Sequence, residues 1–143
     1  FIFPSQPQRD AAVRLKLNPL RANVEGKRIV LVDDSIVRGT TSAKTIRSLK
    51  MAGAKEVHFR ISSPPFTHTC HFGTDIDSEE NLIANHMSIP EIRDLIGADS
   101  LGFLPVDKVE TIAPDSRLHF CKACFSGQYP YPVPEVADKT AFE

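Results

Sequence analysis

Two adjacent carboxylates, followed by a turn rich in glycine and hydroxyl groups, are the side chains of this sequence best suited to chemistry. Residues 29–42 read Ile-Val-Leu-Val-Asp-Asp-Ser-Ile-Val-Arg-Gly-Thr-Thr-Ser. Asp33 and Asp34 can accept hydrogen bonds from sugar hydroxyls or hold a hydrated Mg²⁺ ion. The turn at residues 38–42 leads into a predicted helix, whose first N–H groups lack partners within the helix and favour an anion. The segment therefore predicts a loop that binds a phosphorylated sugar, with Gly39 allowing the backbone to come close to the phosphate.

Each part of this loop also has an ordinary structural explanation. Acid pairs commonly begin turns, and Ser or Thr commonly caps a helix. A turn does not need a buried strand, an acid pair, a glycine–hydroxyl run and a helix in this order. The contiguous arrangement therefore favours ligand binding.

The segments around the loop predict an open α/β fold. The apolar run at residues 29–32 is typical of a parallel strand buried on both faces. Helical spacing over residues 41–52 ends at Gly53, and residues 57–61 alternate as a strand does. Further elements are predicted as helices at 78–84, 89–96 and 106–112, and as a strand at 101–104. Strands that alternate with helices indicate a partial doubly wound, mainly parallel sheet.

The helix at 89–96 has the clearest end signals. Ser88 and Glu91 form a capping-box pattern at its start, and Gly97 follows its end. Ser78 is the expected cap of the helix before it.

Composition narrows the class of protein. The chain has 143 residues, of which 41% are hydrophobic and 24% charged, as expected for one globular domain. A net charge of -1 does not point to nucleic acid or an anionic membrane surface as a partner. No apolar run approaches the roughly 20 residues of a membrane span. We expect a cytoplasmic protein with reduced thiols, because three cysteines are too few for a disulfide scaffold.

The cysteines form a second candidate site. Cys121 and Cys124 are spaced as CxxC, and Cys70 stands alone. The CxxC pair is compatible with a redox pair, half of a zinc site or two ligands of an iron–sulfur cluster, whereas a lone Cys70 is more commonly a small buried hydrophobe. His68 and His71 flank Cys70 and offer nitrogen ligands, but solvent-facing loop histidines are the simpler expectation.

The sequence of this loop resembles the ligand-binding motif of a known protein family. Residues 32–42, Val-Asp-Asp-Ser-Ile-Val-Arg-Gly-Thr-Thr-Ser, resemble the phosphoribosyl pyrophosphate (PRPP) motif of type I phosphoribosyltransferases. The order Asp-Ser-Ile-Val-Arg-Gly-Thr-Thr is similar specifically to the glutamine PRPP amidotransferase family. Similar segments extend the resemblance to about residue 131; they lie at residues 13–18, 52–57, 91–93, 96–101 and 121–129.

The resemblance implies roles for individual residues. Asp33 and Asp34 would hold the ribose hydroxyls of PRPP and contribute to a Mg²⁺ site. Lys16 matches a catalytic basic residue on a flexible loop that meets the pyrophosphate, where a positive charge suits a leaving group whose negative charge grows; without the resemblance it would be an ordinary solvated lysine. The implied PRPP-binding set is Asp33, Asp34, Ser35, Arg38, Gly39, Thr40, Thr41 and Ser42.

The resemblance also selects among the interpretations of the cysteines. One subgroup of the family binds a structural [4Fe-4S] cluster, and Cys70, Cys121 and Cys124 match three of its four thiolate ligands. The fourth ligand would lie upstream of this chain. Such a cluster would tie the C-terminal tail to the body of the domain.

The chain is expected to be a piece of a longer enzyme. It begins without Met, and we predict a lid at residues 1–22, the C-terminal portion of a phosphoribosyltransferase domain at 23–120 and a cluster-binding tail at 121–143. The resemblance implies an N-terminal glutaminase domain, binding of purine nucleotides, a homo-oligomer, and synthesis of 5-phosphoribosylamine from PRPP, glutamine and water. We expect the piece alone to be inactive.

Two other classes of function stay open at this point. One is a module that senses PRPP or nucleotides without turning them over, and the other is a structural metal-binding module built on the CxxC pair. Mg²⁺-dependent PRPP binding separates the first from the second, and ammonia-dependent turnover separates an enzyme from a sensor. Salvage phosphoribosyltransferases share the acid pair and the turn, but they generally lack the cysteines.

Overall fold

A three-stranded parallel sheet forms the centre of the computed structural model, which describes residues 18–76, 78–115, 117 and 119–133. The strands lie in the order β1 (Arg28–Asp33), β2 (Glu56–Ile61) and β3 (Ser100–Phe103). Ile29 is paired with Val57 in the register of the sheet, and Phe59 with Leu101. The predicted α/β class with a parallel sheet is confirmed.

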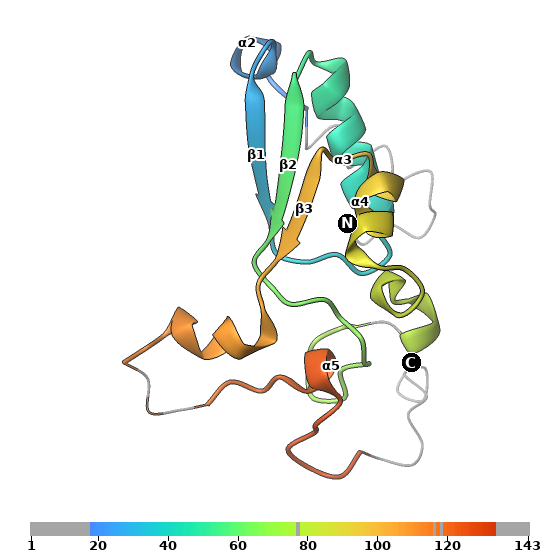
Figure 1. The fold of residues 1–143 in the computed structure, drawn as a ribbon. Coiled ribbons are helices and arrows are strands. Elements are labelled where there is room, and N and C mark those ends of the chain that lie inside the picture. The colour runs from blue at the N-terminus through green and yellow to red at the C-terminus, as the bar shows by residue number, and fades with distance from the viewer. Residues whose placement is uncertain (1–17, 77, 116, 118, 134–143) are drawn as a thin grey trace.

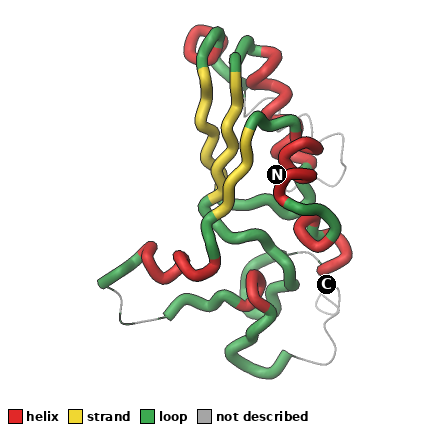
Figure 2. The backbone as a smooth tube through the Cα atoms, in the orientation of Figure 1, coloured by secondary structure: helices red, strands yellow, loops and turns green. Residues whose placement is uncertain are grey.

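Two helices cover one face of this sheet (Figures 1 and 2). Helix α3 (Thr40–Met51) connects β1 to β2, and α4 (Ile89–Ile96) precedes β3. A short helix, α2 (Arg21–Val24), comes before β1. The side chains buried between the sheet and the two long helices include Ile46, Val57, Phe59, Ile92 and Ile96. The alternation predicted for β2 is confirmed, because every second residue of that strand faces this core.

The ends of α4 are those that the sequence predicts. The backbone N–H and the hydroxyl of Ser88 both donate to the Glu91 carboxylate, at 2.7 and 2.6 Å. Gly97 ends the helix in the left-handed conformation, with a φ of 75°. This conformation carries almost no steric cost for glycine, so the helix stops there.

The opposite face of the sheet is open in the described part of the chain. Val30 and Val32 of β1 are 64% and 66% exposed, and Arg60 of β2 is also exposed on that face. The expectation that the apolar run of β1 is buried on both faces is not met within the described residues. The reason is topological, since both crossover helices lie on the same side.

The segment between β2 and α4 contains short 3-10 turns instead of the helix predicted at residues 78–84. These are η1 (Glu79–Asn81) and η2 (Ile83–Asn85), separated by Leu82 in an extended conformation. The Leu82 side chain is fully buried. We infer that burial of this one side chain breaks the helix, because a continuous helix would turn it elsewhere.

A second apolar cluster lies beyond the carboxyl ends of the strands. Its buried members are Phe66, Ile76 and Leu82, and Phe125 packs against them from the short helix α5 (Ala123–Ser126). The connection from β3 to α5 contains the 3-10 helix η3 (Val106–Ile112), where the sequence predicts a short helix. None of the helices among the described residues combines the length and apolarity of a membrane span.

Candidate substrate-binding site

The acid pair stands at the carboxyl end of β1, as predicted. Asp33 is the last residue of the strand, and both carboxylates are exposed. The backbone N–H of Asp34 donates to the Asp33 carboxylate at 3.0 Å, and the Ser35 hydroxyl donates to the Asp34 carboxylate at 3.1 Å. These bonds orient the two side chains while leaving them accessible to a ligand.

The backbone of Asp33 is fixed by the neighbouring strand. The carbonyl of Asp33 accepts hydrogen bonds from the N–H and the hydroxyl of Ser62, at 3.0 and 3.2 Å. Ser62 directly follows β2, so the ends of two adjacent strands hold each other. Sequence reasoning missed this contact, although parallel pairing of the two predicted strands places their ends side by side.

The electrostatics of the pair favour a bound cation or hydroxyl donors. Partial desolvation of the Asp33 carboxyl at the end of the sheet raises its pKa, the N–H of Asp34 opposes this, and the nearby Asp34 carboxylate raises the pKa further. Each added donor or cation near these oxygens would favour the ionised form. The arrangement therefore suits the hydroxyls of a sugar or a divalent metal ion.

Gly39 makes the turn that follows the acid pair possible. It is buried, precedes the first residue of α3, and has a φ of 76°, in the left-handed region. A Cβ at this position would lie 3.1 Å from the Ile83 Cδ1 atom and 3.6 Å from the Ile96 Cγ2 atom. The N–H of Ile83 also donates to the carbonyl of Val37 at 2.9 Å. The turn is thus held by η2 and α4, a contact that no motif in the sequence indicates.

The start of α3 offers backbone donors to an anion. The N–H of Ala43 donates to the Gly39 carbonyl at 2.9 Å, so the N–H groups of residues 40–42 have no partner within the helix. The first turn of α3 carries no acidic side chain. Thr40 and Thr41 are exposed, whereas Ser42 is buried, so the hydroxyl of Ser42 is the least accessible of the predicted set.

The structure therefore brings most of the predicted binding residues into one loop. Ser35 is half-buried and Arg38 is exposed, and both lie between the acid pair and Gly39. Lys16, the predicted catalytic lysine, lies outside the described residues.

Two of the three cysteines lie at the second apolar cluster. Cys70 and Cys124 both pack against this cluster, Cys121 is exposed, and all three are free thiols. Burial raises the pKa of Cys124, and its neighbours Cys70 and Cys121 add to this. Within the described ranges, no group of three His, Cys, Asp or Glu side chains is arranged to hold a metal ion.

Cys70 has the more thiolate-like environment. Burial would raise the pKa of its thiol, but hydrogen bonds from the backbone N–H groups of Phe72, Thr74 and Gly73 and from the Thr74 side chain lower it below its usual value. Such N–H donors also stabilise a sulfur that is bound to a metal. The donor chemistry therefore fits an iron–sulfur ligand, although the three thiols do not form a ligand set here.

The two histidines beside Cys70 are half-buried rather than solvent-facing. The His68 ring packs on Gly127 so closely that a Cβ there would lie 2.7 Å from its Nε2 atom. The His71 ring lies against the Tyr129 ring, with centroids 5.2 Å apart. Both histidines therefore join the loop that carries Cys70 to the segment that carries the CxxC pair.

Comparison with known proteins agrees with this geometry. The chain is 58% identical over 139 residues to "Amidophosphoribosyltransferase, chloroplastic" of Glycine max, which covers 97% of the chain and 24% of the relative. It is 49% identical over 140 residues to the amidophosphoribosyltransferase of Synechocystis sp., covering 98% of the chain and 28% of the relative. No family model matches the chain.

A solved structure is similar in fold as well as sequence. It is the glutamine PRPP amidotransferase from B. subtilis complexed with ADP and GMP, with a TM-score of 0.77 and 49% identity. The match covers 94% of this chain and 30% of that one. The chain thus spans about a quarter to three-tenths of the length of these relatives. Over nearly its whole length, the chain is therefore homologous to a segment of the amidophosphoribosyltransferases.

Proposed function

We propose that the full-length protein is an amidophosphoribosyltransferase and that this chain supplies its PRPP-binding loop. The reaction converts PRPP, glutamine and water into 5-phosphoribosylamine, glutamate and pyrophosphate, at the first step of de novo purine biosynthesis. One observation carries the proposal. An exposed acid pair at the end of β1 is joined, through the left-handed Gly39, to an α3 N-terminus without acidic side chains. Homology over nearly the whole chain supports it.

The loop divides into two parts with different tasks. Asp33 and Asp34 accept hydrogen bonds from the ribose hydroxyls and contribute to a Mg²⁺ site; the ion, when bound, supplies positive charge to the pyrophosphate. The N–H groups at the start of α3 donate to the 5′-phosphate, aided by the helix dipole. The residues proposed around the phosphate are Arg38, Gly39, Thr40, Thr41 and Ser42. Ser35, whose hydroxyl donates to the Asp34 carboxylate, completes the proposed PRPP-binding set.

The lysine on the predicted lid completes the reaction in this proposal. Lys16, within residues 1–22, would contact the pyrophosphate and stabilise the charge that develops as the bond to the ribose breaks. In this proposal, residues 23–120 form part of the transferase domain and residues 121–143 form the cluster-binding tail. These boundaries are predictions from the sequence.

A [4Fe-4S] cluster held by Cys70, Cys121 and Cys124 is the finer part of the proposal. It is supported by the packing of Cys70 and Cys124 against the same apolar cluster and by the N–H donors around Cys70. A cluster would draw the thiols together and would need a fourth ligand from outside this chain. Its role would be structural.

The proposed partners follow from the enzyme. A glutaminase domain of the same polypeptide would supply ammonia, and the protein would work as a homo-oligomer regulated by purine nucleotides. The B. subtilis relative was solved with ADP and GMP. Location in the cytoplasm stays a prediction.

The proposal is tested by PRPP affinity in the full-length protein. Calorimetric titration with Mg²⁺ present would compare wild type with Asp33→Asn and Asp34→Asn. Each variant removes a charged acceptor, and hydrogen bonds to charged groups contribute about 1.5–3 kcal/mol, so affinity should fall about 10- to 100-fold. Asp107→Asn, an exposed change in η3, is the matched control.

Two results would argue against the assignment. Unchanged affinity in both variants would remove the acid pair from the site. Normal PRPP binding without ammonia-dependent turnover would favour the PRPP-sensing module over an enzyme.

A further inference from the structure

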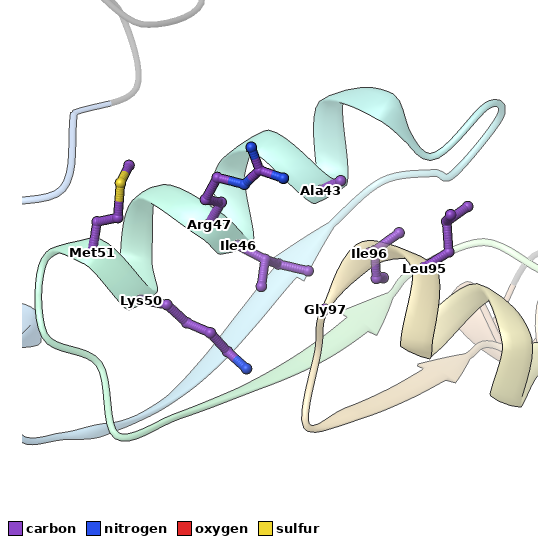
Figure 3. Close-up of a pocket in the computed structure, with 8 residues that line it drawn as sticks. All are labelled: Ala43, Ile46, Arg47, Lys50, Met51, Leu95, Ile96 and Gly97. Carbon is purple, nitrogen blue, oxygen red and sulfur yellow. The ribbon is translucent and has the colours of Figure 1, made fainter.

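A groove of about 520 Å³ opens between α3 and α4, and its lining includes none of the residues proposed to bind PRPP (Figure 3). Its floor is aliphatic, because Ile46 and Ile96 line it and are only 0% and 3% exposed. Met51 of α3 and Leu95 of α4 border it and are 74% and 57% exposed. An element packed in this groove would bury both side chains, and burial of their apolar surface would favour its docking.

The charges at this groove have one sign. Arg47 and Lys50 both line it from α3, three residues apart, and none of the residues that line it is acidic. The Lys50 ammonium pairs with the Asp99 carboxylate at 3.3 Å, yet the Lys50 side chain is still 42% exposed. An occupant would therefore combine an apolar stripe with carboxylates placed toward α3.

The shape and charge select a helix as the occupant. A groove between two packed helices accepts the apolar stripe of a third, with anchors spaced by three or four residues. The matched segment is 24% of the Glycine max relative, so most of that relative's length lies outside it. We propose that the groove docks an acidic, amphipathic helix from the part of the full-length polypeptide that lies outside these 143 residues.

Docking at this groove would also affect the phosphate loop, the turn at residues 38–42 that leads into α3. Ile96 forms part of the groove floor, and its Cγ2 atom lies 3.6 Å from the position that a Cβ on Gly39 would occupy. A helix packed on Ile96 therefore supports the turn at the start of α3. This consequence for PRPP rests on the proposed function, whereas the docking itself does not.

The two methionines of the chain provide the test. Graded oxidation of the native full-length protein with hydrogen peroxide, read by peptide mass spectrometry, compares Met51 with Met87. Met87 is packed against the core and serves as the internal control. If a helix covers the groove, Met51 should oxidise no faster than Met87. A Met51 rate several-fold above that of Met87 would overturn the proposal.

Charge variants test the chemistry of the occupant. Arg47→Glu should raise the oxidation rate of Met51 several-fold without changing that of Met87, whereas Arg47→Lys, the matched control, should preserve protection. Continued protection of Met51 in Arg47→Glu would refute an acidic occupant. If protection of Met51 in the wild type is lost on dilution, the occupant is a second copy of the protein and the proposed internal helix is wrong. Because these readouts do not involve PRPP, their failure is distinct from failure of the proposed function. A fall in PRPP affinity in Arg47→Glu that parallels the exposure of Met51 would confirm the link to the loop.

Discussion

Substitution of Gly39 by Ala tests whether the left-handed turn at the start of α3 is needed for PRPP binding as well as for stability. The φ of 76° at this residue costs an L-amino acid about 1–2 kcal/mol. The new Cβ would also lie 3.1 Å from a terminal methyl group of Ile83, which can move by a few tenths of an ångström. Gly26→Ala is the matched control, because its φ is 73° and nothing lies within 4 Å of the added Cβ.

The two variants should differ in binding. If the phosphate loop of Gly39→Ala relaxes out of the left-handed conformation, PRPP must restore that conformation when it binds. The same 1–2 kcal/mol then appears as a loss of PRPP affinity of about 5- to 30-fold. Gly26→Ala, in the turn before β1, should keep wild-type affinity. Calorimetry on the full-length proteins measures the affinity, and thermal melting measures the stability.

One pattern would refute the reasoning. If Gly39→Ala melts at a lower temperature, as Gly26→Ala does, but binds PRPP as tightly as wild type, the left-handed turn is not part of the phosphate site. If Gly39→Ala changes neither quantity, the backbone at residue 39 is not constrained as the structure indicates.

Three further predictions concern pH, strand pairing and iron. Hydrogen bonds from the Ser88 hydroxyl and N–H hold the pKa of Glu91 below its usual value. Glu91→Gln should therefore be less stable than wild type above about pH 5, and the difference should shrink as acid protonates the wild-type carboxylate. A pH-independent difference in melting temperature would contradict this. The carboxylate of Asp99 accepts the N–H of Val57 at 2.7 Å, so Asp99→Asn should speed amide exchange at Val57, and an unchanged exchange rate would show that the bond contributes little. Cys124→Ser in anaerobically purified full-length protein should abolish bound iron, sulfide and visible absorbance, and an unchanged iron content would exclude Cys124 as a ligand.

Local signals explain which elements the sequence predicts well. Helix α4 has its predicted bounds because Ser88 and Glu91 form their hydrogen bonds at one end and Gly97 adopts a positive φ at the other. Helix α3 begins one residue earlier than predicted, because Gly39 rather than a hydroxyl residue precedes it. The acid pair lies at the end of β1 because a strand of apolar residues must end where two carboxylates need water.

The remaining features depend on contacts between distant segments. The break at Leu82 follows from burial of its side chain in the second cluster, and spacing in the sequence does not reveal which cluster a leucine joins. The packing of Ile83 and Ile96 against Gly39 arises in the same way. The exposure of Val30 and Val32 reflects which side both crossover helices take, a property of topology that an apolar run does not encode.

The tail is joined to the body by contacts that close a long loop. The Thr67 hydroxyl donates to the Phe125 carbonyl and the Tyr129 hydroxyl to the Thr69 carbonyl, across separations of 58 and 60 residues. The N–H groups of Thr67 and His68 add two bonds to the Cys124 carbonyl. The entropy of closing such a loop is lost once, with the first contact, and later contacts at the same place add little to that loss.

These bonds should therefore form and break together as one cooperative unit. Amide exchange at residues 67–68 and at residues 125–127 should share a single opening free energy, lower than that of the central sheet. A protease that cleaves the opened state would then release the tail in one step, so the lifetime of the tail, rather than that of the sheet, would set how long the protein survives intact.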